Sequence, residues 1–231
     1  MAEEDNIKKI IKEVPELILK DIDSFLLLRT DGNLLLHQYK LGGGNILALM
    51  GQFSVLNFLA KVYKILSSGL DGMNKISEET LEVLKECQKK NPELKVIKRP
   101  NKAEIIEIHS FIKLVKDYPL DLGIPKDDDE SIRKVWNDIR NKVSHISSIA
   151  KDNVAVTYEF QDLNFSDALE AIKSATKPAF LREKGRTFCW VDMLNSNLRS
   201  IVTWICNKID AREFSKENIE STISWLRNED L

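Results

Sequence analysis

The chain has 231 residues, 43% hydrophobic and 30% charged, which is ordinary for a globular protein with a sizeable core. Its formal net charge of −2 excludes the basic surplus of a general nucleic-acid binder, so any RNA or DNA site must be local. Three cysteines lie far apart without the paired spacing of a zinc site, and the N-terminus is acidic without an apolar leader. We therefore expect a cytoplasmic protein.

The N-terminal segment combines a helical pattern with a turn signal. Apolar residues recur at helical spacing from Ile7 to Lys20, and Pro15 is expected to kink or split that helix. Asp31-Gly32 then lies between two leucine-rich arms in Ser24–Leu41, which predicts a β-hairpin. The glycine run 42–44 lacks the Gly-Lys-Ser/Thr ending of a phosphate loop, so we interpret it as a flexible helix entry.

The segment from Leu41 to Ala60 carries no charge and is long enough to span a membrane. Its glycines and the amides of Asn45, Gln52 and Asn57 would be costly in lipid, so we predict a buried or interface helix over about 45–67 and no membrane partner. Buried amides must find hydrogen-bond partners. A dimer contact, a cleft or an intrachain bond would each satisfy Gln52 and Asn57.

Two further helices are predicted from capping signals. Ser77 serves as the expected N-cap of a helix to about Lys89, and Asn101 with Glu104 has the capping-box spacing for a helix that ends near Tyr118. Basic residues cluster between positions 85 and 102, and more weakly between 173 and 186. Each cluster is either a solvated surface or a local RNA site.

A fourth helix is predicted from about Glu130 to Ile149, after an acidic run that suits the positive end of its dipole. On a wheel of about 100° per residue, Asn141 and His145 lie nearly opposite the apolar stripe, and Arg140 lies on its flank. The stripe consists of Ile132, Val135, Trp136, Ile139, Val143, Ile146 and Ile149.

In the C-terminal part, the alternation of apolar and polar residues predicts a strand over Val154–Phe160, and helical spacing predicts helices over 167–174, 190–209 and 218–225. Ser166 is the expected N-cap of the first of these helices. The fold class is therefore mainly α, with a small N-terminal β-hairpin and extra C-terminal strand and helices. We divide the chain into residues 1–41, a helical core over 42–150, and 151–231. The last part should pack on the same core, because the connection at 150–153 is too short for a flexible linker.

Arg140-Asn141-x-x-x-His145, late in a helix, resembles the Arg-x4-6-His signature of the HEPN superfamily (higher eukaryotes and prokaryotes nucleotide-binding domains). The polar residue directly after the arginine is one that ribonuclease members favour. The resemblance covers about 45–150. It implies an up-and-down helical bundle and a metal-independent endoribonuclease without cofactor, working as a homodimer whose two Arg140 and His145 pairs line a shared cleft. Many such proteins serve as toxins with antitoxins or in phage defence.

The chemistry of these side chains agrees with the roles that the resemblance implies. A histidine with a pKa of about 6.5 can take the proton of an RNA 2′-OH or protonate the leaving oxygen, so His145 is the candidate base or acid. Arg140 would hold the scissile phosphate through parallel hydrogen bonds, and Asn141 would orient His145 or the phosphate. Separate acid and base would require a second subunit, because this constellation offers one histidine per chain.

Other interpretations stay open. His145 is otherwise an exposed histidine or one packed against a neighbouring helix; His37 fits a half-buried strand position, and His109 a charged helix face near Glu104 and Glu107. No His/Asp/Glu cluster has metal-site spacing. A second hypothesis is a catalytically silent HEPN-like domain that binds RNA, a nucleotide or a partner such as a nucleotidyltransferase antitoxin. A third is a helical interaction protein in which the motif is accidental.

Overall fold

The computed structural model describes residues 2–30, 43–90, 100–144, 154–157, 178–183 and 186–228. Within them the protein is mainly helical, as predicted, with one small sheet. The helices are α1 (Ala2–Thr30), α2 (Gly43–Lys90), α3 (Lys102–Asp117), α4 (Asp129–Ser144), α6 (Val191–Asp210) and α7 (Lys216–Asn228). The strands are β1 (Val154–Thr157), β2 (Phe180–Glu183) and β3 (Arg186–Trp190).

Helix α1 is longer than the sequence predicted, and its length shows that the predicted β-hairpin is wrong for residues 24–30. It runs through Pro15 without ending there and continues to Thr30, so residues 24–30 are helical and do not form a strand. Extending an existing helix adds a hydrogen bond for each residue that becomes ordered, whereas a hairpin must be nucleated afresh. Asp31-Gly32 and the second arm of the predicted hairpin lie outside the described residues.

Helix α2 consists of two helical segments that meet at Gly69. Gly69 has φ 69° and ψ 168°, and a Cβ at this position would lie 2.9 Å from Asn218 Oδ1. This conformation suits glycine and interrupts the helix. The prediction of Ser77 as an N-cap is therefore wrong: Ser77 lies inside the second segment, and its hydroxyl donates to the Asn74 carbonyl at 2.6 Å.

Local capping fixes the starts of α3 and α4. The Asn101 side chain accepts from the Glu104 backbone N–H at 2.8 Å, and the Glu104 carboxylate accepts from the Asn101 N–H at 3.0 Å, which confirms the capping box. At α4, the Asp128 carboxylate accepts hydrogen bonds from the Ser131 hydroxyl and from the backbone N–H groups of Ser131 and Glu130. These hydrogen bonds hold the pKa of Asp128 below its usual value. The predicted continuation of α4 beyond Ser144 lies outside the described residues.

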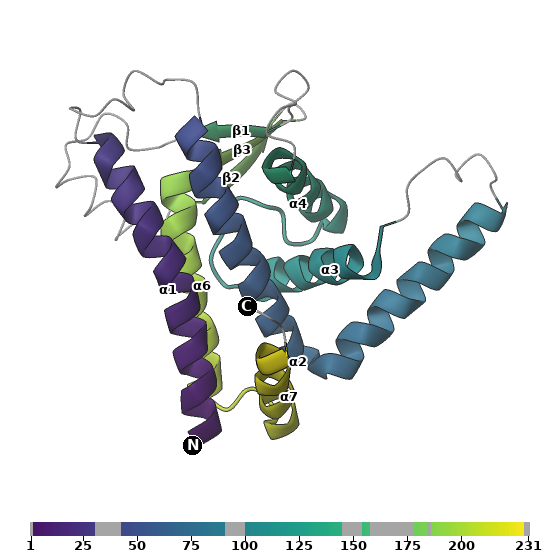
Figure 1. The fold of residues 1–231 in the computed structure, drawn as a ribbon. Coiled ribbons are helices and arrows are strands. Elements are labelled where there is room, and N and C mark those ends of the chain that lie inside the picture. The colour runs from purple at the N-terminus through teal and green to yellow at the C-terminus, as the bar shows by residue number, and fades with distance from the viewer. Residues whose placement is uncertain are drawn as a thin grey trace.

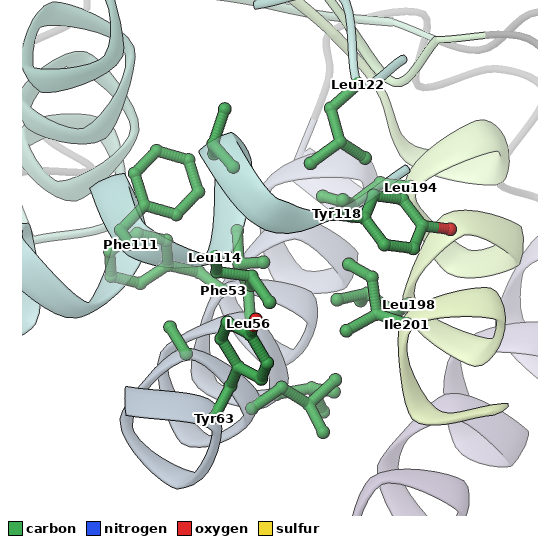
Figure 2. Packing of buried hydrophobic residues seen from close by; sticks show 14 of the residues in the cluster. Phe53, Leu56, Tyr63, Phe111, Leu114, Tyr118, Leu122, Leu194, Leu198 and Ile201 are labelled. Atoms are coloured by element: carbon green, nitrogen blue, oxygen red, sulfur yellow. The ribbon is translucent and has the colours of Figure 1, made fainter. Parts of the chain in front are cut away.

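The core is assembled around the first segment of α2, which lies among α1, α6 and α3 (Figure 1). Trp136 of α4 is fully buried, with ring centroids 4.5 Å from Phe53 of α2 and 4.8 Å from Phe111 of α3. Figure 2 shows side chains of α2 and α3 facing those of α6 in the same core. One hydrophobic cluster includes residues from α1, α2, α3, α4, β3, α6 and α7. The domain boundaries at 41/42 and 150/151 stay predictions.

Much of the uncharged segment of α2 is buried from Ala48 onward, although Leu47 is 62% exposed, and the Gln52 amide has an intrachain partner. Gln52 is fully buried, and its Nε2 donates to the Val191 carbonyl and, at 3.2 Å, to Asn195 Oδ1 of α6. Of the three alternatives for Gln52, the structure therefore contains the intrachain bond. No helix among the described residues is long and apolar enough to cross a membrane.

The sheet has the order β1-β3-β2, with β1 parallel and β2 antiparallel to β3. A strand was predicted at β1, whereas β2 and β3 were not foreseen; the predicted helix over 167–174 lies outside the described residues. Gly123, at φ 81°, lets the loop after α3 approach β2, where the Phe180 N–H donates to the Leu122 carbonyl at 2.9 Å. Helices α6 and α7 confirm the last two predicted helices.

Candidate functional site

Arg140 lies in the penultimate turn of α4 and faces two carboxylates of α3. Its NH2 group donates to Glu104 Oε1 at 2.8 Å, and its Nε lies 3.9 Å from Glu107 Oε2. The side chain is 35% exposed. The guanidinium is therefore held in one orientation by charge-assisted contacts while part of its surface faces solvent.

Glu107 links Arg140 to α2. Its Oε1 accepts from Asn57 Nδ2 at 3.1 Å and lies 3.7 Å from Lys61 Nζ. The Asn57 amide nitrogen, like that of Gln52, thus has a partner within the chain, whereas the buried Oδ1 of Asn57 and Oε1 of Gln52 accept no hydrogen bond from the described residues. Three helices contribute to this polar cluster, which we call the Arg140 cluster: Asn57 and Lys61 from α2, Glu104 and Glu107 from α3, and Arg140 from α4.

The carboxylates beside Arg140 were not identified as its partners from the sequence. From the sequence, Glu104 was interpreted as a capping residue and as part of a charged face near His109, and in the structure it both caps α3 and holds Arg140. The spacing of Glu104 and Glu107 places them on one face of α3, which is a usable signal. That signal does not say which helix the face meets, because the pairing joins residues 36 positions apart.

The packing of α3 against α4 is antiparallel along a line of polar contacts. Arg140 near the end of α4 meets Glu104 near the start of α3, and Asp129 at the start of α4 lies 2.5 Å from Lys116 near the end of α3. Both contacts are at least partly exposed. The line of contacts aligns the two helices and leaves the Arg140 cluster at one end of their seam.

Asp138 fixes the opposite flank of α4 to the sheet. Its Oδ2 accepts from the Thr187 hydroxyl of β3 at 2.8 Å and from Arg182 NH1 of β2 at 3.2 Å, and its side chain is 16% exposed. These contacts with β2 and β3 leave the Asp138 side chain mostly, though not completely, buried.

The other two predicted site residues are described in part or not at all. Asn141 belongs to α4, but its side chain lies outside the described part of the structure, as does the whole of His145. The distance from Arg140 to His145 and the proposed composite dimer cleft are therefore untested. The catalytic assignment of Arg140, Asn141 and His145 stays a prediction.

The remaining histidines do not form a second constellation in the described residues. His109 of α3 is partly buried, and its Nε2 lies 3.4 Å from the Thr80 hydroxyl of α2. Burial, with the nearby positive charges of Arg133 and Lys64, lowers the pKa of His109 below 6.5. His37 lies outside the described residues.

Cysteine and metal chemistry add no further candidate in the part of the chain that is described. Cys87 is exposed, whereas Cys189 and Cys206 are buried as free thiols whose pKa values are raised by burial. The described residues contain no group of three or more His, Cys, Asp and Glu side chains that could hold a metal ion.

Comparisons of the chain with protein-family models, with curated proteins and with solved structures find no match. The resemblance to the HEPN superfamily thus rests on the sequence motif Arg140-Asn141-x-x-x-His145.

Proposed function

We propose that this protein is a metal-independent endoribonuclease of HEPN type, built on Arg140 and Asn141 of α4 and on His145, and completed by a second copy of the chain. The observation that carries the proposal is the setting of Arg140. Its guanidinium is oriented by Glu104, is 35% exposed, and lies five residues before a histidine. An oriented, partly exposed guanidinium suits a transferring phosphate, since little ordering remains to be done on binding.

The proposed reaction needs no group beyond these side chains. His145 of one subunit takes the 2′-OH proton of the substrate, and the 2′ oxygen attacks the adjacent phosphorus. The bond from phosphorus to the 5′ oxygen breaks, and His145 of the second subunit protonates that oxygen. Arg140 offsets the negative charge on the phosphoryl oxygens, and the products are a 2′,3′-cyclic phosphate and a 5′-hydroxyl.

The test is cleavage of a 5′-labelled single-stranded RNA in EDTA by wild type, His145→Ala and Arg140→Lys. We expect His145→Ala to abolish cleavage. Arg140→Lys should lower it about tenfold or more, because lysine keeps the charge but loses the planar fork. Arg227→Lys is the matched control, since Arg227 is exposed on α7, away from α4 in Figure 1. The mechanism is contradicted if His145→Ala still cleaves the RNA. It is also contradicted if wild type cleaves single-stranded DNA, which has no 2′-OH, as well as it cleaves RNA.

One observation favours the second candidate function, a catalytically silent HEPN-like domain that binds RNA, a nucleotide or a protein partner such as an antitoxin. Glu104 and Glu107 place two negative charges beside Arg140, and a phosphate must compete with them. Under this hypothesis wild type retains the labelled RNA in a gel-shift assay but yields no cyclic-phosphate product. Glu104→Gln, which removes one competing charge, should then tighten RNA binding.

A further inference from the structure

A groove separate from the Arg140 cluster lies between α1 and α6 and is closed by the residues that follow α3. Its volume is about 700 Å³. Pockets of this size, mostly apolar with a few oriented polar groups, are typical of small-molecule sites. Nothing in the proposed ribonuclease mechanism uses this groove.

One wall of the groove is the end of a polar network that crosses three helices. Gln52 of α2 donates to Asn195 of α6 at 3.2 Å, and Asn195 Nδ2 donates to Asp23 Oδ1 of α1 at 2.6 Å. Gln52 and Asn195 are fully buried. A buried network of this kind holds its outermost members in fixed positions.

Arg199 of α6 lies at the groove end of the network, between two carboxylates. Its NH2 donates to Asp23 Oδ2 at 2.5 Å, and its Nε donates to Glu16 Oε2 at 3.1 Å. Burial lowers the pKa of Arg199, but the hydrogen bonds to Asp23 and Glu16 outweigh that effect and raise it. The Arg199 guanidinium donates to these carboxylates through Nε, NH1 and NH2, whereas Arg140 donates only to Glu104 among the described residues, so Arg199 has few donors left for a ligand phosphate.

The charges of the groove therefore suit a neutral ligand. Glu16 and Asp23 contribute two negative charges, and Arg199 and Lys20 contribute two positive ones. Each carboxylate oxygen can accept more than one hydrogen bond, and the Glu16 side chain is 38% exposed. The groove thus offers acceptors to hydroxyl groups of a ligand without a surplus of positive charge.

The remaining walls are a row of hydroxyls and an apolar surface. Ser196, Ser200 and Thr203 follow one another on α6 at helical spacing, and the apolar surface consists of Trp204, also on α6, with Pro119 and Leu120 from the segment after α3. Tyr118 also lines the groove, and Figure 2 shows its hydroxyl directed toward α6. The residue is 1% exposed, and its hydroxyl lies close enough to Ser200 for that side chain to act on the Tyr118 pKa, but without the geometry of a full hydrogen bond. A buried hydroxyl with so poorly aligned a partner is costly, and a ligand hydrogen bond would satisfy it.

We propose that this groove binds a small neutral ligand with a sugar diol, as found in a free sugar or a nucleoside. The Glu16 carboxylate accepts from the two neighbouring hydroxyls of the diol, and the ring system packs against Leu120 and Trp204. The hydroxyls of α6 and Tyr118 satisfy the remaining polar atoms of the ligand. This proposal does not rest on the ribonuclease activity.

The test is isothermal titration calorimetry of the full chain with adenosine, guanosine, cytidine, uridine and D-ribose. We expect at least one of them to bind with a dissociation constant of about 1 mM or tighter. Binding of ribose identifies the sugar as sufficient, whereas binding of nucleosides alone identifies the nucleoside as the source. The 2′-deoxy form of a bound nucleoside should bind about fivefold more weakly, since one hydroxyl of the diol is lost. A 5′-phosphate should not tighten binding.

Variants separate the groove from other binding sites. Thr203 is an exposed residue of the groove wall, so Thr203→Trp fills the groove without touching the core and should weaken binding about tenfold or more. Ser224→Trp, at an exposed position of α7, is the matched control and should bind like wild type. Absence of binding by all five probes, equal binding by Thr203→Trp and wild type, or tighter binding of the nucleoside 5′-phosphate each overturns the proposal.

Discussion

The contact between Glu104 and Arg140 allows us to predict how much free energy of unfolding is lost when Glu104 is replaced. In Glu104→Ala, the hydrogen bond to Arg140 and the return bond of the capping box are both lost. A charge-assisted hydrogen bond contributes about 1.5–3 kcal/mol when well buried; with Arg140 35% exposed, we discount it to about 1 kcal/mol. The cap adds about 0.5–1 kcal/mol. The free energy of unfolding should therefore fall by about 1.5–2 kcal/mol.

Glu104→Gln separates the two contributions. The glutamine oxygen can still accept from the Asn101 backbone N–H, so the capping bond is kept while the negative charge is lost. Glu104→Gln should then cost about 0.5–1 kcal/mol, roughly half the cost of the alanine variant. Combining it with Arg140→Gln completes a double-mutant cycle, and the coupling free energy should be about 0.5–1 kcal/mol.

The assay is equilibrium unfolding in urea, followed by circular dichroism, for wild type, both single variants and the double variant. Equal m-values establish that the denatured states are comparable. A coupling free energy below about 0.3 kcal/mol would refute the reasoning, because independent sites add within that margin. It would mean that the Glu104–Arg140 contact does not orient the guanidinium in solution.

Three further predictions concern the fold. Gly123→Ala should cost at least about 2 kcal/mol in urea unfolding, because a Cβ would lie 1.6 Å from the Phe180 carbonyl oxygen at a φ of 81°; a cost under 1 kcal/mol contradicts this. Trp136→Ala should lower the free energy of unfolding by about 3–5 kcal/mol, measured in the same way, because it opens a cavity between Phe53 and Phe111. His109 should make the protein less stable in acid. Its folded-state pKa lies below the unfolded value of 6.5, so its contribution is present above pH 6.5 and is lost as the pH falls through the folded-state pKa. Unfolding at pH 5, 6 and 7.5 should show a smaller acid loss in His109→Gln, and an unchanged loss excludes His109 as the cause.

The arrangement around Arg140 also bears on the two candidate functions. Asp138 joins α4 to the sheet and Arg140 joins it to α3, so α4 is fixed on both flanks just before the motif ends. A fixed helix is what a ribonuclease site requires, since reacting groups must be held to within a fraction of an ångström. However, the carboxylates that orient Arg140 also weaken its attraction for phosphate, because their negative charges lie beside the guanidinium. The cleavage assay with His145→Ala therefore decides more than any measurement of RNA affinity.

The sequence by itself determined the features that depend on neighbouring residues. Asn101 and Glu104 are three positions apart and form the capping box as predicted, and the four-residue spacing of Ile132 and Trp136 correctly placed both in the core. Such features are predictable because helix caps and helical faces are set by local geometry. Arg140 was singled out differently, by its place in the motif Arg140-Asn141-x-x-x-His145 and the resemblance of that motif to the HEPN signature.

Only the tertiary structure decided what those faces meet. The pairing of Arg140 with Glu104, the parallel pairing of β1 with β3, and the burial of Asp138 under the sheet all join residues distant in sequence. The same holds for Gln52, whose partner Asn195 lies 143 positions away. A periodic pattern states that a helix has a buried side, but many partners of similar polarity could cover it. The choice among them depends on the packing of all the helices together.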